Sequence, residues 1–169
     1  LFSATFFGGT GRRLKSNAEA VSFLVLDFDN SKPLLDEAGD PIKDADDKII
    51  KVRIDHPVGI MDVESTISAY DYVLVTSHSH AADWPRFRLV VPVESPVPAG
   101  SWTPYAEAML AKLGLDEFLR ALDSVYKTAN QIYYWPSHSP GSKLAYYRRN
   151  KGAVLPAYVP GMATTPSTV

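Results

Sequence analysis

The sequence predicts an α+β fold in which a mixed β-sheet is flanked by helices. Runs of apolar, often β-branched residues predict buried strands, and helix-start and helix-end signals lie between and after them. With 169 residues, of which 46% are hydrophobic and 21% charged, the chain suffices for one globular domain with its own core. We expect that domain over residues 1–159 and a flexible tail over 160–169. Because the chain starts at Leu1 rather than Met, we expect it to be a piece of a longer protein.

The first half of the chain predicts a strand, a hairpin and a short helix. Residues 21–30 are apolar at nearly every position, as in a strand that is covered on both faces. A stretch rich in Asp, Lys, Pro and Gly follows at 31–47, and residues 48–54 alternate enough to form the second arm of a hairpin. A short helix fits residues 61–69, which carry acids near the start.

Two further strands and a connector are predicted next. Residues 72–76 and 86–93 form apolar runs. Pro92 indicates that the second of these strands ends there or lies at a sheet edge, because proline has no N–H to donate. Residues 94–100 are rich in proline and predict a connector.

The last predicted elements are two helices and an aromatic strand. Thr103 is typical of a helix N-cap, and Gly114 is typical of a helix end. A second short helix is expected from Asp116 toward Leu122, and a strand over residues 131–136.

Composition excludes some classes of function. Because the chain has no Cys, it contains neither a disulfide nor a cysteine-based metal site. No apolar run approaches the roughly 20 residues that cross a bilayer, so we expect no membrane partner and a cytoplasmic location. The net charge of −2 does not predict a nucleic-acid binder, although it leaves room for a locally basic groove.

Two aspartates at the end of the first strand predict a metal site. Side chains alternate along a strand, so Asp27 and Asp29 point to the same side, about 7 Å apart. Such like charges repel unless a cation lies between them, and Mg²⁺ or Mn²⁺ readily accepts carboxylate oxygens. The alternative is that both aspartates begin a polar loop.

A second candidate cluster follows the strand at 72–76. Hydroxyl and imidazole groups succeed one another there, and the next strand places Arg86 and Arg88 on one face. Cations, imidazoles and hydroxyls that gather in this way favour the binding of phosphate groups. The alternative is a loop of satisfied polar groups beside a solvated strand face. The residues of the cluster are Thr76, Ser77, His78, Ser79 and His80.

Two basic segments are candidates for contact with nucleic acid. Arg12 and Arg13 follow clustered glycines, which could let backbone amides approach phosphate, although a solvated loop explains them as well. Tyr146, Arg148 and Arg149 interleave rings with cations, which suits single-stranded DNA. An ordinary exposed strand would have the same pattern.

Taken in order, three motifs resemble those of the archaeo-eukaryotic primase superfamily, above all primases and primase-polymerases of plasmids, phages and integrated elements. They are Val25-Leu-Asp-Phe-Asp29, then Val75-Thr-Ser-His-Ser-His80 with Pro85-Arg-Phe-Arg-Leu-Val-Val-Pro92, and finally Leu122-Asp123 ahead of Gln131-Ile-Tyr-Tyr-Trp-Pro-Ser137. The resemblance implies a primase-like catalytic core with an RNA-recognition-like half that carries the site.

The resemblance also implies roles for individual residues. Asp27, Asp29 and Asp123 would be the ligands of two Mg²⁺ or Mn²⁺ ions, although Asp116 lies close enough to replace Asp123. His78 would contact the phosphates of a nucleoside triphosphate, with His80 as the alternative. Arg86 and Arg88 would be the cations beside the triphosphate.

The function that we expect is synthesis of short primers on single-stranded DNA by template-directed nucleotidyl transfer, in the replication of a mobile element. The resemblance further implies a fused or separate helicase and a helical accessory domain as partners. One alternative is a haloacid-dehalogenase-like phosphatase with Asp27 as its nucleophile and Asp29 as general acid and base. The other is a non-catalytic module that binds single-stranded DNA.

Overall fold

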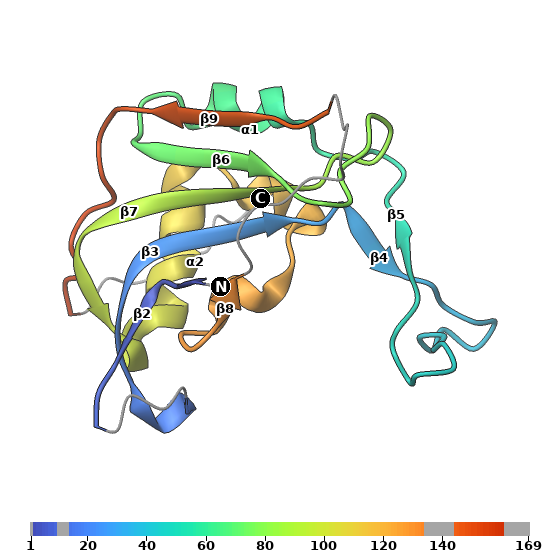
Figure 1. The fold of residues 1–169 in the computed structure, drawn as a ribbon, viewed down its shortest axis with the longest axis horizontal. Helices are drawn as coiled ribbons and strands as arrows, with labels where there is room; N and C mark the ends of the chain where they lie inside the picture. Colours follow the sequence, from blue (N-terminus) through green and yellow to red (C-terminus); the bar gives the residue numbers. More distant parts are fainter. Residues whose placement is uncertain (1, 10–13, 134–143, 161–169) are drawn as a thin grey trace.

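A computed structural model, which describes residues 2–9, 14–133 and 144–160, confirms the α+β class (Figure 1). Its central sheet has five strands in the order β2-β3-β7-β6-β9, and neighbouring strands are antiparallel. Parallel pairing occurs as isolated bridges, for example between Val93 and Leu155. The strands of this sheet are β2 (Thr5–Phe7), β3 (Ala18–Phe28), β6 (Tyr72–Thr76), β7 (Phe87–Pro98) and β9 (Tyr147–Asn150).

Two smaller strand pairs accompany the central sheet. Strands β1 (Phe2–Ser3) and β8 (Ile132–Tyr133) are antiparallel partners, as are β4 (Ser31–Pro33) and β5 (Lys51–Arg53). The second pair confirms the predicted hairpin, and Figure 1 shows that its loop projects away from the sheet. We call residues 31–53 the arm.

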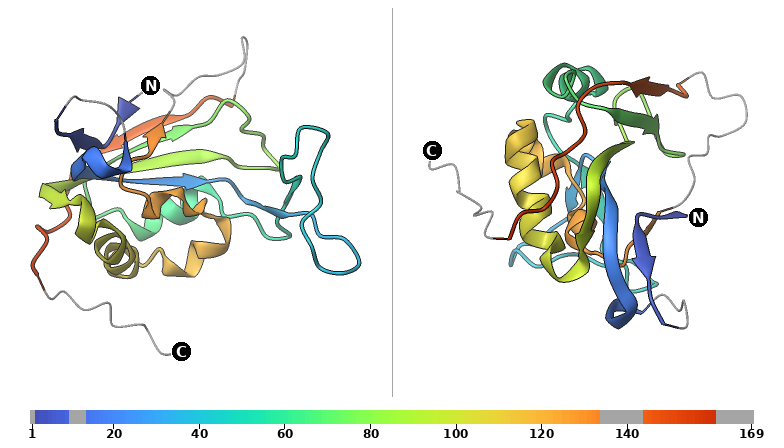
Figure 2. Two further views of the ribbon diagram at one scale, coloured as in Figure 1. Left: turned by 90° about the horizontal axis from the view of Figure 1, so that it is seen from below. Right: turned by 90° about the vertical axis from the view of Figure 1, so that its left-hand side faces the viewer.

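Helices cover one face of the sheet, as Figure 2 shows from below. Their apolar side chains meet those of β3 and β7, and Phe28 stacks on Phe87 with ring centroids 4.6 Å apart. The helices on this face are α1 (Ile60–Thr66) and α2 (Trp102–Leu113), with the 3₁₀ turns η2 (Ala99–Ser101), η3 (Asp116–Ala121) and η4 (Ser124–Lys127). A further 3₁₀ turn, η1 (Lys15–Asn17), directly precedes β3 and buries none of its residues. Predicted α1, α2 and the short helix at Asp116 are therefore present, the last as a 3₁₀ helix.

Helix α2 ends where its sequence predicts. Gly114 adopts φ +69°, the left-handed region in which a side chain is strained, and its N–H reaches the carbonyl of Leu110 or Ala111. A Cβ at this position would also meet Thr66 Cγ2 at 3.3 Å. The turn therefore joins the end of α2 closely to α1.

The predicted strand end at Pro92 and the predicted connector at 94–100 were wrong, whereas the alternative of a sheet edge at Pro92 holds locally. Strand β7 continues through Pro92 to Pro98 and remains paired with β3 after a bulge between Val21 and Phe23. The pairing of β6 with β7 extends only as far as Val90, and the Pro92 carbonyl accepts from Leu155 N at 3.0 Å. Pro92 therefore lies past the end of β6, where β7 has no paired strand on that side among the described residues. The missing N–H of the proline costs no hydrogen bond between strands there.

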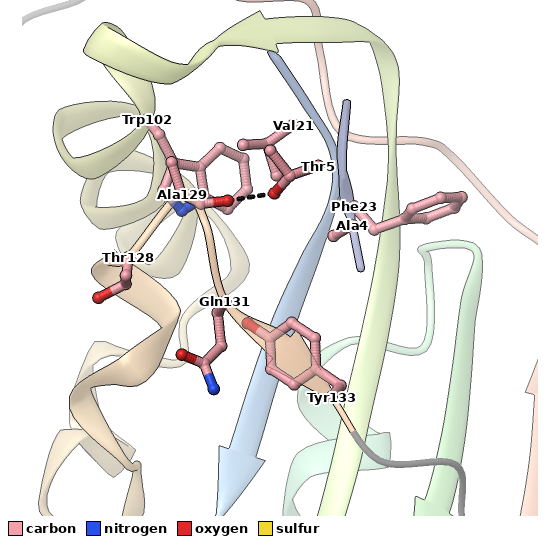
Figure 3. Close-up of a pocket in the computed structure, with 9 residues that line it drawn as sticks. All are labelled: Ala4, Thr5, Val21, Phe23, Trp102, Thr128, Ala129, Gln131 and Tyr133. Atoms are coloured by element: carbon pink, nitrogen blue, oxygen red, sulfur yellow. Dashed lines mark hydrogen bonds between the residues drawn. The ribbon is translucent and has the colours of Figure 1, made fainter. Parts of the chain in front are cut away.

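A shallow hollow lies beside β3, where β2, α2 and the segment before β8 meet (Figure 3). Thr5 Oγ1 donates across it to the Ala129 carbonyl, and Trp102 lines its helix side. Tyr133 lines the hollow and also packs against Arg88, whose guanidinium lies 5.0 Å from the ring centroid. The hollow contains no carboxylate among its lining residues, so the candidate site lies elsewhere.

Candidate active site

Three carboxylates from two distant parts of the chain gather at one end of β3. Asp27 lies on β3, and Asp29 is the first residue after the end of this strand. Asp123 lies nearly 100 residues later, but its N–H donates to the Asp27 carbonyl at 2.9 Å. Phe28 and Leu122 form a bridge beside this hydrogen bond, so the backbone itself holds the third aspartate next to the first two.

Each carboxylate is paired with a cation. Arg88 donates to both oxygens of Asp27, from Nε at 2.6 Å and from Nη2 at 3.0 Å. Arg86 pairs with Asp29 through Nε at 2.8 Å and through Nη2. The register places Asp27 opposite Arg88 on β7. Because Asp29 and Arg86 each lie two residues from this pair, the second aspartate also comes close to the second arginine.

Lys51 is a cation that the sequence did not single out. Its Nζ lies 3.1 Å from Asp29 Oδ2 and 3.6 Å from Asp123 Oδ2. It comes from β5, at the base of the arm, opposite Pro33. One ammonium group thus bridges two carboxylates that lie far apart in the sequence.

Burial and charge shift the pKa values in this cluster in opposite directions. Burial opposes ionisation of Asp29, but hydrogen bonds and charges from Arg86 and Lys51 outweigh it and hold the pKa of Asp29 below its ordinary value. Burial likewise opposes the charge of Lys51, but Asp29 and Asp123 raise its pKa above the ordinary value. Both groups are therefore charged near neutral pH.

The loop after β6 brings further polar groups to Arg86. Ser79 Oγ accepts from Arg86 Nη1 at 2.9 Å, and His80 Nδ1 accepts from the Arg86 N–H at 3.1 Å. The side chain of His78 is exposed. Ser77 Oγ is buried and has no hydrogen-bond partner among the described residues. Of the two candidate histidines, His80 is thus the one that the structure fixes beside the cluster.

Trp84 is another residue of the site that the sequence analysis missed. Its Nε1 donates to the Asp29 carbonyl at 3.0 Å, and the guanidinium of Arg86 lies 5.3 Å from its ring centroid. The indole therefore orients both partners of one ion pair. A lone Trp in a polar loop gives no signal of this role in the sequence.

Thr76 lies on the other face of the sheet. It is fully buried, and its hydroxyl bonds to the backbone of Tyr146, accepting from N at 2.9 Å and donating to O at 3.3 Å. This hydroxyl joins β6 to the start of β9 and does not reach the cluster. Asp116 is exposed at the start of η3, so Asp123 is the acid that shares Lys51.

The basic residues of β9 divide between the two faces. Tyr146 and Arg148 contact buried Glu64 of α1, at 3.0 Å and 3.4 Å. Tyr72 donates to the same carboxylate, and burial together with Glu64 raises the pKa of Tyr72 to about 12. Arg149, the next residue of β9, points to the opposite face of the sheet from Arg148. Arg12, Arg13 and the tail beyond residue 160 lie outside the described residues.

The donor set of the cluster suits a hard divalent ion. Carboxylate oxygens are the ligands that Mg²⁺ and Mn²⁺ prefer, and Asp29 with Asp123 already shares one cation, the Lys51 ammonium. Within residues 2–9, 14–133 and 144–160, no three acidic or histidine side chains converge on one metal position. The residues that suit a divalent ion are therefore Asp29 and Asp123, which Lys51 now bridges, with Asp27 beside them.

The comparisons with known proteins identify the family. The model of the VapE N-terminal domain matches residues 43–159, which is more than half of the chain. The chain belongs to the VapE N-terminal domain family. This domain is found in replication-associated VapE proteins of phages and plasmids, so the chain is a replication-related protein of mobile elements.

No curated protein and no solved structure matches this VapE N-terminal domain. The matched range contains Lys51, Arg86, Arg88 and Asp123 but begins after Asp27 and Asp29. Among the described residues, no helix is long and apolar enough to cross a membrane.

Proposed function

We propose that this VapE N-terminal domain is a nucleotidyl transferase that makes short primers on single-stranded DNA in the cytoplasm. The observation that carries the proposal is the convergence of Asp27, Asp29 and Asp123 on three cations at one end of the sheet. A replication-related family supports the choice of nucleic acid as product. A membership in the archaeo-eukaryotic primase superfamily is part of the proposal.

The cations of the cluster would bind the triphosphate of the incoming nucleotide. Arg88 lies on β7 and Arg86 directly precedes this strand, two residues away, and arginine donors suit phosphate oxygens. Ser79 and His80 hold the Arg86 side chain and backbone, so they position it. His78, which is exposed on the same loop, is free to approach a bound nucleotide, and so His78 and His80 would have different roles.

Asp29 and Asp123 would hold a divalent ion, and Asp27 would join them once Arg88 turns to the phosphates. Bound Mg²⁺ or Mn²⁺ would lower the pKa of the attacking 3′-hydroxyl and stabilise the charge of the leaving pyrophosphate. The backbone hydrogen bond from Asp123 to Asp27 keeps Asp123 next to Asp27 and Asp29, whichever cation the carboxylates bind.

The face of the sheet opposite the helices supports a single-stranded template as partner, because Tyr147 is exposed on it. The register aligns Asp27, Arg88, Val75 and Tyr147 in one row across β3, β7, β6 and β9. Tyr147 is 66% exposed, and two strand spacings of about 4.8 Å separate it from Arg88. Bases of single-stranded DNA stack on exposed rings of this kind, so Tyr147 and Arg149 would guide the template past the nucleotide. A helicase and a helical accessory domain would act with it.

The test is incorporation of a labelled nucleotide by the purified domain with Mg²⁺ or Mn²⁺, on single-stranded DNA with and without an annealed primer. We expect metal-dependent products in the wild type and none in the Asp27→Ala/Asp29→Ala double variant. The primed template tests extension separately from initiation. The proposal fails if the primed template is not extended, or if the double variant extends it as the wild type does. Release of phosphate from a simple monoester instead would favour the phosphatase.

A further inference from the structure

Lys51 stands on the arm, but its charge lies at the carboxylate cluster. Residues 34–41 and 43–49 of the arm are exposed, yet the Lys51 ammonium reaches back to Asp29 and Asp123. The side chain is 45% exposed, so solvent and small ligands can approach it.

The base of the arm is fixed, which makes this placement reproducible. Arg53 Nη1 donates to the Asp83 carbonyl at 2.6 Å and pairs with its carboxylate at 2.9 Å. Asn30, which is fully buried with φ 48°, accepts from Val58 N and donates to Pro85 O. These contacts tie both ends of the arm to the loops that precede α1 and β7, so β5 presents Lys51 to the cluster from an anchored base.

Charge balance points to a role for Lys51 in the reaction cycle. In the structure three carboxylates face three cations, Arg86, Arg88 and Lys51, so the cluster is formally neutral. A divalent ion bound by Asp29 and Asp123 would compete with the ammonium for the same oxygens. Lys51 would then be a cation without a partner, beside a nucleotide whose phosphates need one.

We propose that Lys51 is the third phosphate-binding cation of the site, which neutralises Asp29 and Asp123 in the free protein and moves to the triphosphate when a metal ion binds. This inference rests on the proposed function and names one more residue of the same site. It differs from a purely structural role in one respect, because a structural Lys51 would stabilise the fold without changing the affinity for either ligand.

The test measures two affinities in Lys51→Ala, Lys51→Arg and the control Lys48→Ala. Lys48 lies on the same arm and pairs with exposed Asp46, so its loss changes the charge of the arm but not of the site. Binding of Mn²⁺ alone is followed by electron paramagnetic resonance, and binding of a non-hydrolysable deoxyadenosine triphosphate analogue with Mn²⁺ is followed by calorimetry.

We expect Lys51→Ala to bind Mn²⁺ more tightly than the wild type, because a competitor is gone, and to bind the triphosphate about tenfold more weakly, as for one lost charge-assisted hydrogen bond. Lys51→Arg should restore most of the triphosphate affinity, and Lys48→Ala should equal the wild type. Unchanged triphosphate affinity in Lys51→Ala, or weaker Mn²⁺ binding, would overturn the inference.

An Asp29→Asn variant separates this inference from the proposed function. If Asp29→Asn binds Mn²⁺ as the wild type does, the proposed metal site is wrong, and the role of Lys51 is overturned with it. If Asp29→Asn loses Mn²⁺ but Lys51→Ala keeps wild-type affinity for both ligands, only the inference about Lys51 is overturned.

Discussion

Replacing Arg88 by methionine should destabilise the fold by about 2–3 kcal/mol, because it leaves a largely buried carboxylate without its cation. Methionine keeps much of the apolar stem, so the change removes mainly the guanidinium. Arg88 is 18% exposed and Asp27 is 27% exposed at their side chains, so water compensates only in part for the lost pair.

The magnitude follows from the contacts. The pair has two charge-assisted hydrogen bonds, of 2.6 Å and 3.0 Å. Hydrogen bonds to charged groups contribute about 1.5–3 kcal/mol, and we take the lower part of this range because both side chains touch solvent. The contact of Arg88 with the Tyr133 ring, at 5.0 Å, adds about 0.5–1 kcal/mol. For a chain of this size the midpoint of thermal unfolding should fall by about 5–10 °C.

A double-mutant cycle isolates the pair from other effects of the substitution. The free energy of unfolding is measured by urea denaturation for the wild type, Arg88→Met, Asp27→Ala and the variant with both changes. We expect a coupling energy of about 1–2 kcal/mol, because Asp27→Ala removes the carboxylate that Arg88→Met has left without its cation. Effects of the two substitutions that add to within about 0.5 kcal/mol would refute the ion pair.

Three further predictions concern pH, a turn and the template. Asp29 has a lowered pKa and Lys51 a raised one, so the stability that their pair contributes should be lost at both extremes of pH. It should be lost as pH falls through the native pKa of Asp29, below about 3.9, and as pH rises through the native pKa of Lys51, above about 10.4. Urea denaturation across pH should show a weaker loss of stability at both extremes in Asp29→Asn than in the wild type. Gly114→Ala should cost about 1 kcal/mol by thermal unfolding, whereas Gly100→Ala, in open space and without a positive φ, should be nearly neutral. Tyr147→Ala should weaken binding of single-stranded DNA in fluorescence anisotropy by about 1–3 kcal/mol, and Tyr147→Phe should not; equal binding by all three proteins would exclude the ring as a stacking platform.

The fold class was predictable because local signals and burial agree. Most of the apolar run at 21–30 became β3, an inner strand of the sheet, and Gly114 ended α2 at the predicted residue. Strand β7 could not be predicted in full, since four of its last five residues are polar or proline and its pairing with β3 resumes there after a bulge. That pairing depends on tertiary contacts that a local pattern does not contain.

The candidate site was predictable in part, for the same physical reason. Asp27 and Asp29, like Arg86 and Arg88, stand two residues apart at the end or start of a strand, so their spacing alone indicates one face. Lys51 lies on a short polar strand with no distinctive pattern, and only the hairpin pairing brings it to the carboxylates. Thr76 was assigned to the wrong face of the sheet, because the strand alternation continues through it and turns its side chain toward the helices.

One measurement tests the central claim most directly. Extension of a primed single-stranded template by the purified domain is compared between Asp123→Ala and Asp116→Ala, two acids that lie seven residues apart but only one of which shares Lys51. If the cluster is a nucleotidyl transfer site, metal-dependent extension is lost in Asp123→Ala and kept in Asp116→Ala. Equal extension by both variants would contradict the claim that the acids around Lys51 carry the chemistry.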